Sequence, residues 1–351
     1  MKKIMKQKIS SRMLSLSLVI IAFVIVTVMR STGNLSRQLF SLMVPICCYT
    51  VAAIGLNMNV GISGELNLGQ AGFMSIGGFS AAIAAAILKN TVNSEALLLI
   101  IAIIAGALMA GFLGWLISIP VLKLKGDYLA IVTLAFGQII MSILNNLYIG
   151  FDSTGLHFSF ATNTLKLAEG GKMIISGPMG VAGNQTISSF TAGIVLVVVS
   201  LLIVYNLIQS RTGRAIMACR DNRIAAETVG IRASKMKTIS FVVSSALAGA
   251  AGALYMMNYS SVAASKFDFN TSILILVYVV LGGLGNMTGT IIATALLVAL
   301  PEMLRFLSSY RMLIYAIVLI VIMIVTNNSK TRELMVGIKR RIRRKGAKEN
   351  A

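Results

Sequence analysis

Charged residues are scarce in this sequence. Only 12% of its 351 residues are Asp, Glu, Lys or Arg, whereas a soluble domain carries about 25%. Hydrophobic residues make up 57% of the chain. This composition excludes an ordinary soluble protein and favours a chain whose surface faces lipid.

Residues that build metal or catalytic centres are also few. The chain has one histidine, His157, and three cysteines, Cys47, Cys48 and Cys219. Adjacent cysteines rarely bridge and no CxxC spacing occurs, while a lone histidine lacks the second histidine that zinc sites commonly use. We interpret the cysteines as packing residues and His157 as solvated. With no paired carboxylates and no serine–histidine pair, we expect neither a cofactor nor an enzyme.

A phosphate-binding loop is missing too. Gly64 and Gly69 have the spacing of the glycines in GxxxxGK[ST], but Gln70 and Ala71 stand where the motif needs Lys and Ser or Thr. Without that lysine there is no phosphate anchor. The sequence therefore predicts that this chain does not bind ATP by that route.

Long apolar runs are what the sequence does contain. Crossing a bilayer as a helix takes about 20 apolar residues, and these runs are continuous rather than alternating, which indicates helices and not barrel strands. We predict an all-α polytopic protein of about ten transmembrane helices within residues 13–327. The runs cover about 13–29, 39–62, 66–88, 96–119, 128–149, 187–209, 236–257, 272–284, 289–306 and 311–327. The glycine-rich stretches 61–72 and 282–289 are each either a tight turn or a broken helix.

Basic residues are distributed unevenly between these runs. The net charge is +20, and the segments 1–12, 120–127, 210–237 and 328–351 hold 5, 2, 7 and 9 of the 31 Lys and Arg residues. Cytoplasmic loops carry such an excess. We therefore place both termini in the cytoplasm and the loop 150–186 outside. The basic N-terminus and tail are solvated or contact anionic lipid, and we expect no nucleic-acid partner.

The cytoplasmic loop 210–237 contains a predicted short helix. Asp221 or Asn222 can cap its N-terminus, and Gly230 can end it in the left-handed conformation. Ala225 and Ala226 are predicted to pack closely. Such a compact helix is suited to docking by a soluble partner. The alternative interpretation is an ordinary connecting loop.

The stretch 55–79 has seven glycines and three asparagines. Polar groups at membrane depth are tolerated where they line a wet cavity or are buried in protein, and glycines also permit close helix packing. Glu65 lies either at the cytoplasmic mouth or deeper, where it would be functional. The candidate residues of a translocation pathway are Asn57, Asn59, Glu65, Asn67, Gln70 and Gln138.

Six segments in order resemble the LivM-type permease subunit of branched-chain amino acid ABC transporters. They are GLNMNVGISGELNLGQAGF (55–73), GDYLAIVTLAFGQII (126–140), SGPMGVAG (176–183), SRTGRAIMACRDNRIAAETVGI (210–231), KMKTISFVVSSALAGAAGALY (235–255) and SILILVYVVLGGLGNMTGTIIATALL (272–297).

The resemblance implies a bacterial plasma-membrane importer for leucine, isoleucine and valine. Its implied partners are a second, homologous permease subunit in a heterodimer, two cytoplasmic ATP-binding subunits and an external substrate-binding protein. The residues that match the ATPase-coupling segment are Arg214, Arg220, Ala225, Ala226, Glu227 and Gly230. Two alternatives stay open: the same machine with another small solute, such as urea, an amide, a nucleoside or a sugar, or a stand-alone secondary transporter.

Overall fold

The computed structural model describes residues 15–28, 37–89, 92–124, 126–152, 155–160, 172–184, 186–304 and 310–327. The chain forms two compact units, Met1–Ala295 and Leu296–Ala351, and each is described by itself. The predicted basic N-terminus 1–12 and tail 328–351 lie outside the described residues.

Helices occupy every predicted apolar run. The first unit contains a helix over Ser15–Val28, then α2 (Arg37–Asn57), the π-helix η1 (Met58–Ser63), α3 (Gln70–Leu88), α4 (Glu95–Val121), α5 (Asp127–Asn145), α6 (Phe190–Gln209), α7 (Arg211–Asp221), α8 (Arg223–Thr228), α9 (Ala233–Met256) and α10 (Phe269–Gly282). Short 3-10 turns occur at Gly177–Met179 and Ala264–Phe267. Helix α11 (Met287–Met303) begins in the first unit and ends in the second, which also contains α12 (Arg311–Asn327).

Six helices within the described ranges are long and apolar enough to cross a membrane. They are Phe40–Ser63, Gln70–Leu88, Glu95–Val121, Asp127–Asn145, Phe190–Gln209 and Ala233–Met256. Shorter apolar helices cover Ser15–Val28, Phe269–Gly282 and Met287–Met303. The mainly helical, polytopic architecture therefore agrees with the prediction, while the number of about ten spans stays a prediction.

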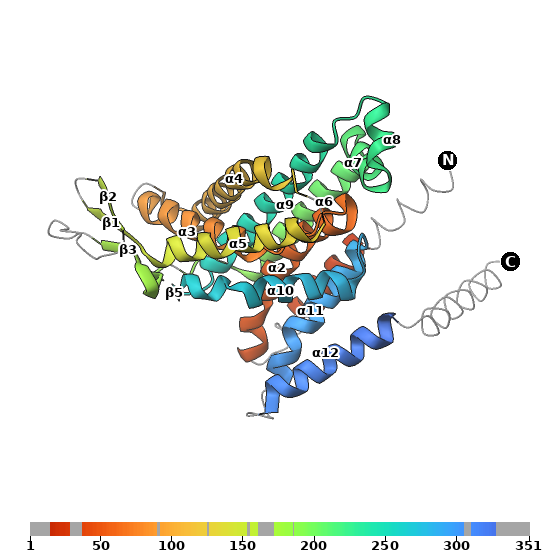
Figure 1. The fold of residues 1–351 in the computed structure, drawn as a ribbon. Coiled ribbons are helices and arrows are strands. Elements are labelled where there is room, and N and C mark those ends of the chain that lie inside the picture. The colour runs from red at the N-terminus through yellow and green to blue at the C-terminus, as the bar shows by residue number, and fades with distance from the viewer. Residues whose placement is uncertain are drawn as a thin grey trace. The chain divides into compact units, whose positions relative to one another are not determined.

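Glycine contacts place α9 at the centre of the first unit, beside α3 and α4 (Figure 1). A methyl group on Gly77 of α3 would overlap the backbone of Gly249 in α9, and one on Gly252 would overlap the backbone of Met74. Such close backbone approach is how membrane helices pack without a hydrophobic driving force. The outer helices instead expose large apolar side chains, such as Leu108 on α4 and Ile131 on α5, as a lipid-facing surface does.

The predicted outer loop and the segment after α9 together form a small antiparallel sheet, which the sequence analysis missed. Its strands are β1 (Leu147–Asp152), β2 (Gly155–Phe160), β3 (Lys172–Ser176), β4 (Val181–Ala182) and β5 (Ser261–Val262), in the order β2-β1-β3-β4-β5. Tyr148 of β1 lies opposite Ser159 and Ser176 of its two neighbours. His157, predicted to be solvated, is 39% exposed and contacts the Asp152 carboxylate at 3.1 Å.

The sheet fixes which helix ends lie on the same side of the first unit. Strand β5 follows α9 directly, and its Val262 pairs with Val181 of β4, which precedes α6. Helices α7 and α8 lie between the other ends of α6 and α9, and Figure 1 shows them at the end of the bundle opposite the sheet. The first unit therefore has a sheet end and an α7–α8 end.

Candidate functional site

The helix that begins with α2 is interrupted inside the first unit. It continues as η1 and stops at Ser63, and α3 begins at Gln70. Of the six irregular residues between them, Glu65, Asn67 and Gly69 are buried. The Gln70 amide donates to the Ala52 carbonyl of α2 at 3.2 Å and to the Ser244 carbonyl at 3.5 Å, near the middle of α9. Helix α3 therefore starts within the bundle, and we call α2, η1, the irregular residues 64–69 and α3 together the interrupted helix. The choice between a tight turn and a broken helix for 61–72 stays a prediction.

Side chains satisfy the backbone of this interruption. The Asn67 carboxamide oxygen accepts from the Gly69 N–H at 2.9 Å, and its nitrogen donates to Gln70 Oε1 at 3.2 Å. The Leu68 N–H donates to the Thr133 hydroxyl of α5, and the Ala71 N–H to the Ser272 hydroxyl of α10, both at 3.1 Å. These contacts meet the requirement that buried backbone groups be hydrogen-bonded within the protein.

The π-helix before the interruption is fastened to the turn between α10 and α11. Asn57 donates to the Thr290 hydroxyl and accepts from the Gly285 N–H, both at 2.7 Å. Gly283 and Gly285 have positive φ angles of 92° and 78°, which favour glycine. Of the two alternatives for 282–289, the structure therefore has the tight turn.

Two buried polar groups of η1 have no partner. The Asn59 carboxamide oxygen accepts from the Ser240 hydroxyl at 3.4 Å, but the Asn59 nitrogen and the Ser63 hydroxyl make no hydrogen bond within the described part of the chain. Native interiors rarely leave such groups unpaired. π-Helices also occur frequently at functional sites, so both features single out η1.

Five of the six predicted pathway residues lie between the end of α2 and the start of α3. They are Asn57, Asn59, Glu65, Asn67 and Gln70. Glu65 forms an ion pair with Lys237 near the start of α9, at the α7–α8 end of the unit. Gln138 is half-buried on α5, and no hydrogen bond joins its side chain to the other five within the described ranges. The sequence analysis missed the hydroxyl partners on other helices, which are Thr133, Ser240, Ser272 and Thr290.

The predicted coupling helix is α8, and it is preceded by a second helix, α7, that was not predicted. The Ser210 hydroxyl caps α7 by accepting from the Gly213 N–H at 3.1 Å. Asn222, rather than Asp221, caps α8 by accepting from the Ala225 N–H at 3.0 Å. Gly230 follows α8 with a left-handed φ of 84°, as predicted.

Only one of the two predicted packing alanines is buried. Ala226 is 4% exposed and packs with Cys219 of α7 and Ala233 of α9. Ala225 is exposed, which contradicts the prediction that both pack closely. Successive residues on an α-helix point about 100° apart, so a six-residue helix that lies on a surface buries one of the pair.

Two large apolar side chains, one in α8 and one just after it, are exposed among charged residues. Ile224 and Val229 are 76% and 75% exposed. Beside them lies an open groove of about 590 Å³, lined by Arg223, Glu227, Gly230, Ile231, Arg232, Ala233, Ser234 and Lys235. Glu227 pairs with Arg223 at 2.9 Å, and the exposed Arg214 donates to the Gln209 carbonyl at 2.9 Å.

Comparison with known proteins gives consistent matches. A family model described as "Branched-chain amino acid transport system / permease component" matches residues 38–325. The chain is 34% identical over 291 residues to the high-affinity branched-chain amino acid transport system permease protein LivM of Salmonella typhimurium, and 35% identical over 286 residues to LivM of Escherichia coli K12. Each alignment covers 79% of this chain and 66% of the relative, so the chain spans just under two thirds of their length.

A more distant relative is LivH of Salmonella typhimurium, which is 25% identical over 250 residues, covering 71% of this chain and 79% of the relative. No solved structure matches the chain. The match of one family model to most of the chain, over the helices that hold the interruption and the α7–α8 segment, shows that the chain belongs to the permease component family of branched-chain amino acid transport systems.

Proposed function

We propose that this chain is a transmembrane permease subunit of an ABC importer for leucine, isoleucine and valine. The observation that carries the proposal is the interrupted helix at 64–69, whose buried polar groups lie in a membrane bundle of this family. Half-helices that start inside a bundle often bind the substrate in transporters.

The orphan donors of η1 support a pathway for zwitterions. The Asn59 amide and the Ser63 hydroxyl are buried without partners in the described ranges, and a buried unpaired donor is costly. A substrate carboxylate would supply the missing acceptor, while the apolar side chains of the bundle tolerate the aliphatic group. Urea, an amide, a nucleoside or a sugar is the alternative cargo, which an external binding protein would select.

The exposed apolar side chains in and after α8 support the proposal that separate ATP-binding subunits supply the energy for transport. Exposed apolar side chains beside charged ones occur at protein interaction sites, and Ile224 and Val229 are two such side chains at the α7–α8 end. We assign that end, with both termini, to the cytoplasm, where two ATP-binding subunits dock. A second permease related to this one completes the pathway, and an external binding protein delivers substrate at the sheet end of a chain with about ten spans.

The direct test of the cargo is uptake. Loss of this chain, in a strain with no redundant system, is expected to abolish uptake of labelled leucine, isoleucine and valine, because no conduit remains. Excess unlabelled urea, nucleoside or sugar is expected to leave wild-type uptake unchanged. Unchanged leucine uptake without the chain would remove the substrate assignment.

The sidedness of α8 can be tested with Ile224→Cys and a membrane-impermeant maleimide. The native Cys47, Cys48 and Cys219 are buried, and burial raises the pKa of the Cys219 thiol, so background labelling is expected to be low. We expect Ile224→Cys to react in inside-out vesicles from cells that express this chain without the ATP-binding subunits, which would otherwise cover it, but not in intact cells. Met179→Cys, 71% exposed at the sheet end, is the matched control with the opposite pattern, and reversed patterns would overturn the topology.

Variants of the α8 segment are expected to uncouple ATP hydrolysis from transport. Gly230→Pro requires a negative φ where the backbone has +84° and removes the N–H that donates to the Glu227 carbonyl, while Ala226→Glu buries a charge. We expect transport per ATP to fall by about tenfold or more, since each change costs on the order of 2–3 kcal/mol locally.

The matched control is Gly183→Pro, because Gly183 has a similar φ of 71° and, like Gly230, no atom within 4 Å of an added Cβ. It lies at the sheet end, so the coupling ratio is expected to stay at the wild-type value. The ratio is measured in proteoliposomes. Normal pumping by both α8 variants would refute the docking assignment.

A further inference from the structure

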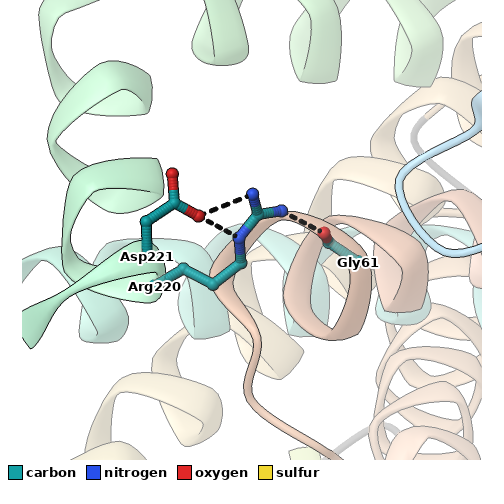
Figure 2. A network of polar contacts seen from close by, with 3 residues as sticks. All are labelled: Gly61, Arg220 and Asp221. Carbon is teal, nitrogen blue, oxygen red and sulfur yellow. Dashed lines mark hydrogen bonds and ion pairs between the residues drawn. The ribbon is translucent and has the colours of Figure 1, made fainter.

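Arg220, near the end of α7, reaches across to the interrupted helix. Its Nη1 donates to the Gly61 carbonyl of η1 at 2.9 Å. Its Nε and Nη2 donate to one carboxylate oxygen of Asp221 at 3.0 and 2.8 Å. Figure 2 shows the guanidinium held between the two partners. Asp221 therefore orients the planar guanidinium, whose Nη1 donates to the Gly61 carbonyl.

The Gly61 carbonyl is a favourable hydrogen-bond acceptor for the positively charged Arg220. Carbonyls in the last turn of a helix lack partners within the helix and carry partial negative charge, so a cation there is favourable. Gly61 also has no room for a side chain, because an added methyl group would overlap Asn57 and Gly285. Asn57 is hydrogen-bonded to Gly285 and Thr290. A displacement of Gly61 against Asn57 and Gly285 would therefore also move the α10–α11 turn.

A second contact holds the same turn, and it comes from the segment that follows α8 in the chain. Lys237, near the start of α9, pairs with Glu65, and both side chains are mostly buried. Between the two contacts Gly64 has a φ of 77°, and a methyl group added there would lie 2.7 Å from Arg220 Cγ. The turn 61–65 is thus held by two side chains that flank α8, one before it and one after it.

We propose that Arg220 is a positioning residue that transmits displacement of α8 to the interrupted helix. The inference rests on the proposed function and deepens it. An ATPase moving α8 displaces the end of α7 and the start of α9 together. Arg220 and Lys237 then carry the turn 61–65 with them, which shifts Asn67 and Gln70 against α5 and α9 and changes access along the polar stretch. In this proposal the hydrogen bond from Arg220 to the Gly61 carbonyl stays intact throughout the transport cycle.

The first test uses the complete transporter in proteoliposomes. With Arg220→Gln, the ATP-binding subunits are expected to co-purify and hydrolyse ATP near the wild-type rate, because Ile224 and Val229 are unchanged. Leucine transported per ATP is expected to fall by about tenfold or more, the effect of losing one charge-assisted hydrogen bond. Arg211→Gln is the matched control, since this arginine is exposed at the start of the same helix α7, and its ratio is expected to stay at the wild-type value.

The second test replaces the hydrogen bond between Arg220 and Gly61 by a disulfide between positions 64 and 220. A Cβ added at Gly64 lies 3.8 Å from the Cβ of Arg220, which matches the mean separation in disulfides of about 3.8 Å. In a Cys219→Ser background, the reduced Gly64→Cys/Arg220→Cys pair is expected to be as uncoupled as Arg220→Gln. Oxidation is expected to restore transport per ATP, and reductant to remove it again. Gly64→Cys alone, treated with the same oxidant, is the control.

Three results would overturn the inference: a wild-type ratio in Arg220→Gln, loss of the ATP-binding subunits from that variant, or a cross-linked pair that stays uncoupled. Loss of the subunits would make Arg220 part of the docking surface and not a transmitter. Failure of the proposed function has a different signature, because the wild-type chain would then recruit no ATP-binding subunit or transport no leucine.

Discussion

The structure depends on one requirement, that the irregular backbone between Ser63 and Gln70 be hydrogen-bonded without water. In a helix these groups would bond to one another, but here they need partners from elsewhere. Thr133 of α5, Ser272 of α10 and the side chain of Asn67 supply them. The interruption therefore exists only because surrounding helices hold it, and any movement of those helices changes what its polar groups can bind.

On the proposed function, the same requirement would let a movement at the α7–α8 end act inside the bundle. Helices α7 and α8 lie on the end of the unit, yet Arg220 and Lys237 reach from either side of α8 to the turn where the interruption begins. Glycine contacts between α3, α4 and α9 make the rest of the bundle stiff, since closely packed backbones leave little room to deform. On the proposed mechanism, displacement of the turn is therefore directed into the irregular stretch 64–69.

Sequence patterns located the helices well but could not show how the polar residues meet. Continuous apolar runs predict helices because only helices satisfy their own backbone in lipid, and Asn222 and Gly230 marked the ends of α8 through local chemistry. The partners of Asn57 and Leu68 lie 233 and 65 residues away, and single hydroxyls in apolar helices carry no pattern. The short strands were missed because their pairing, including β4 with β5 across α6 to α9, is set by tertiary contacts.

Amide hydrogen exchange across residues 64–72 tests the central claim most directly, with the assembled transporter in lipid nanodiscs. At rest, the hydrogen bonds of Leu68, Gly69 and Ala71 are expected to protect this stretch almost as well as the core of α9. Trapping the ATP-binding subunits with nucleotide and vanadate is expected to abolish that protection while α9 stays protected. Equal protection of 64–72 in both states would contradict the account.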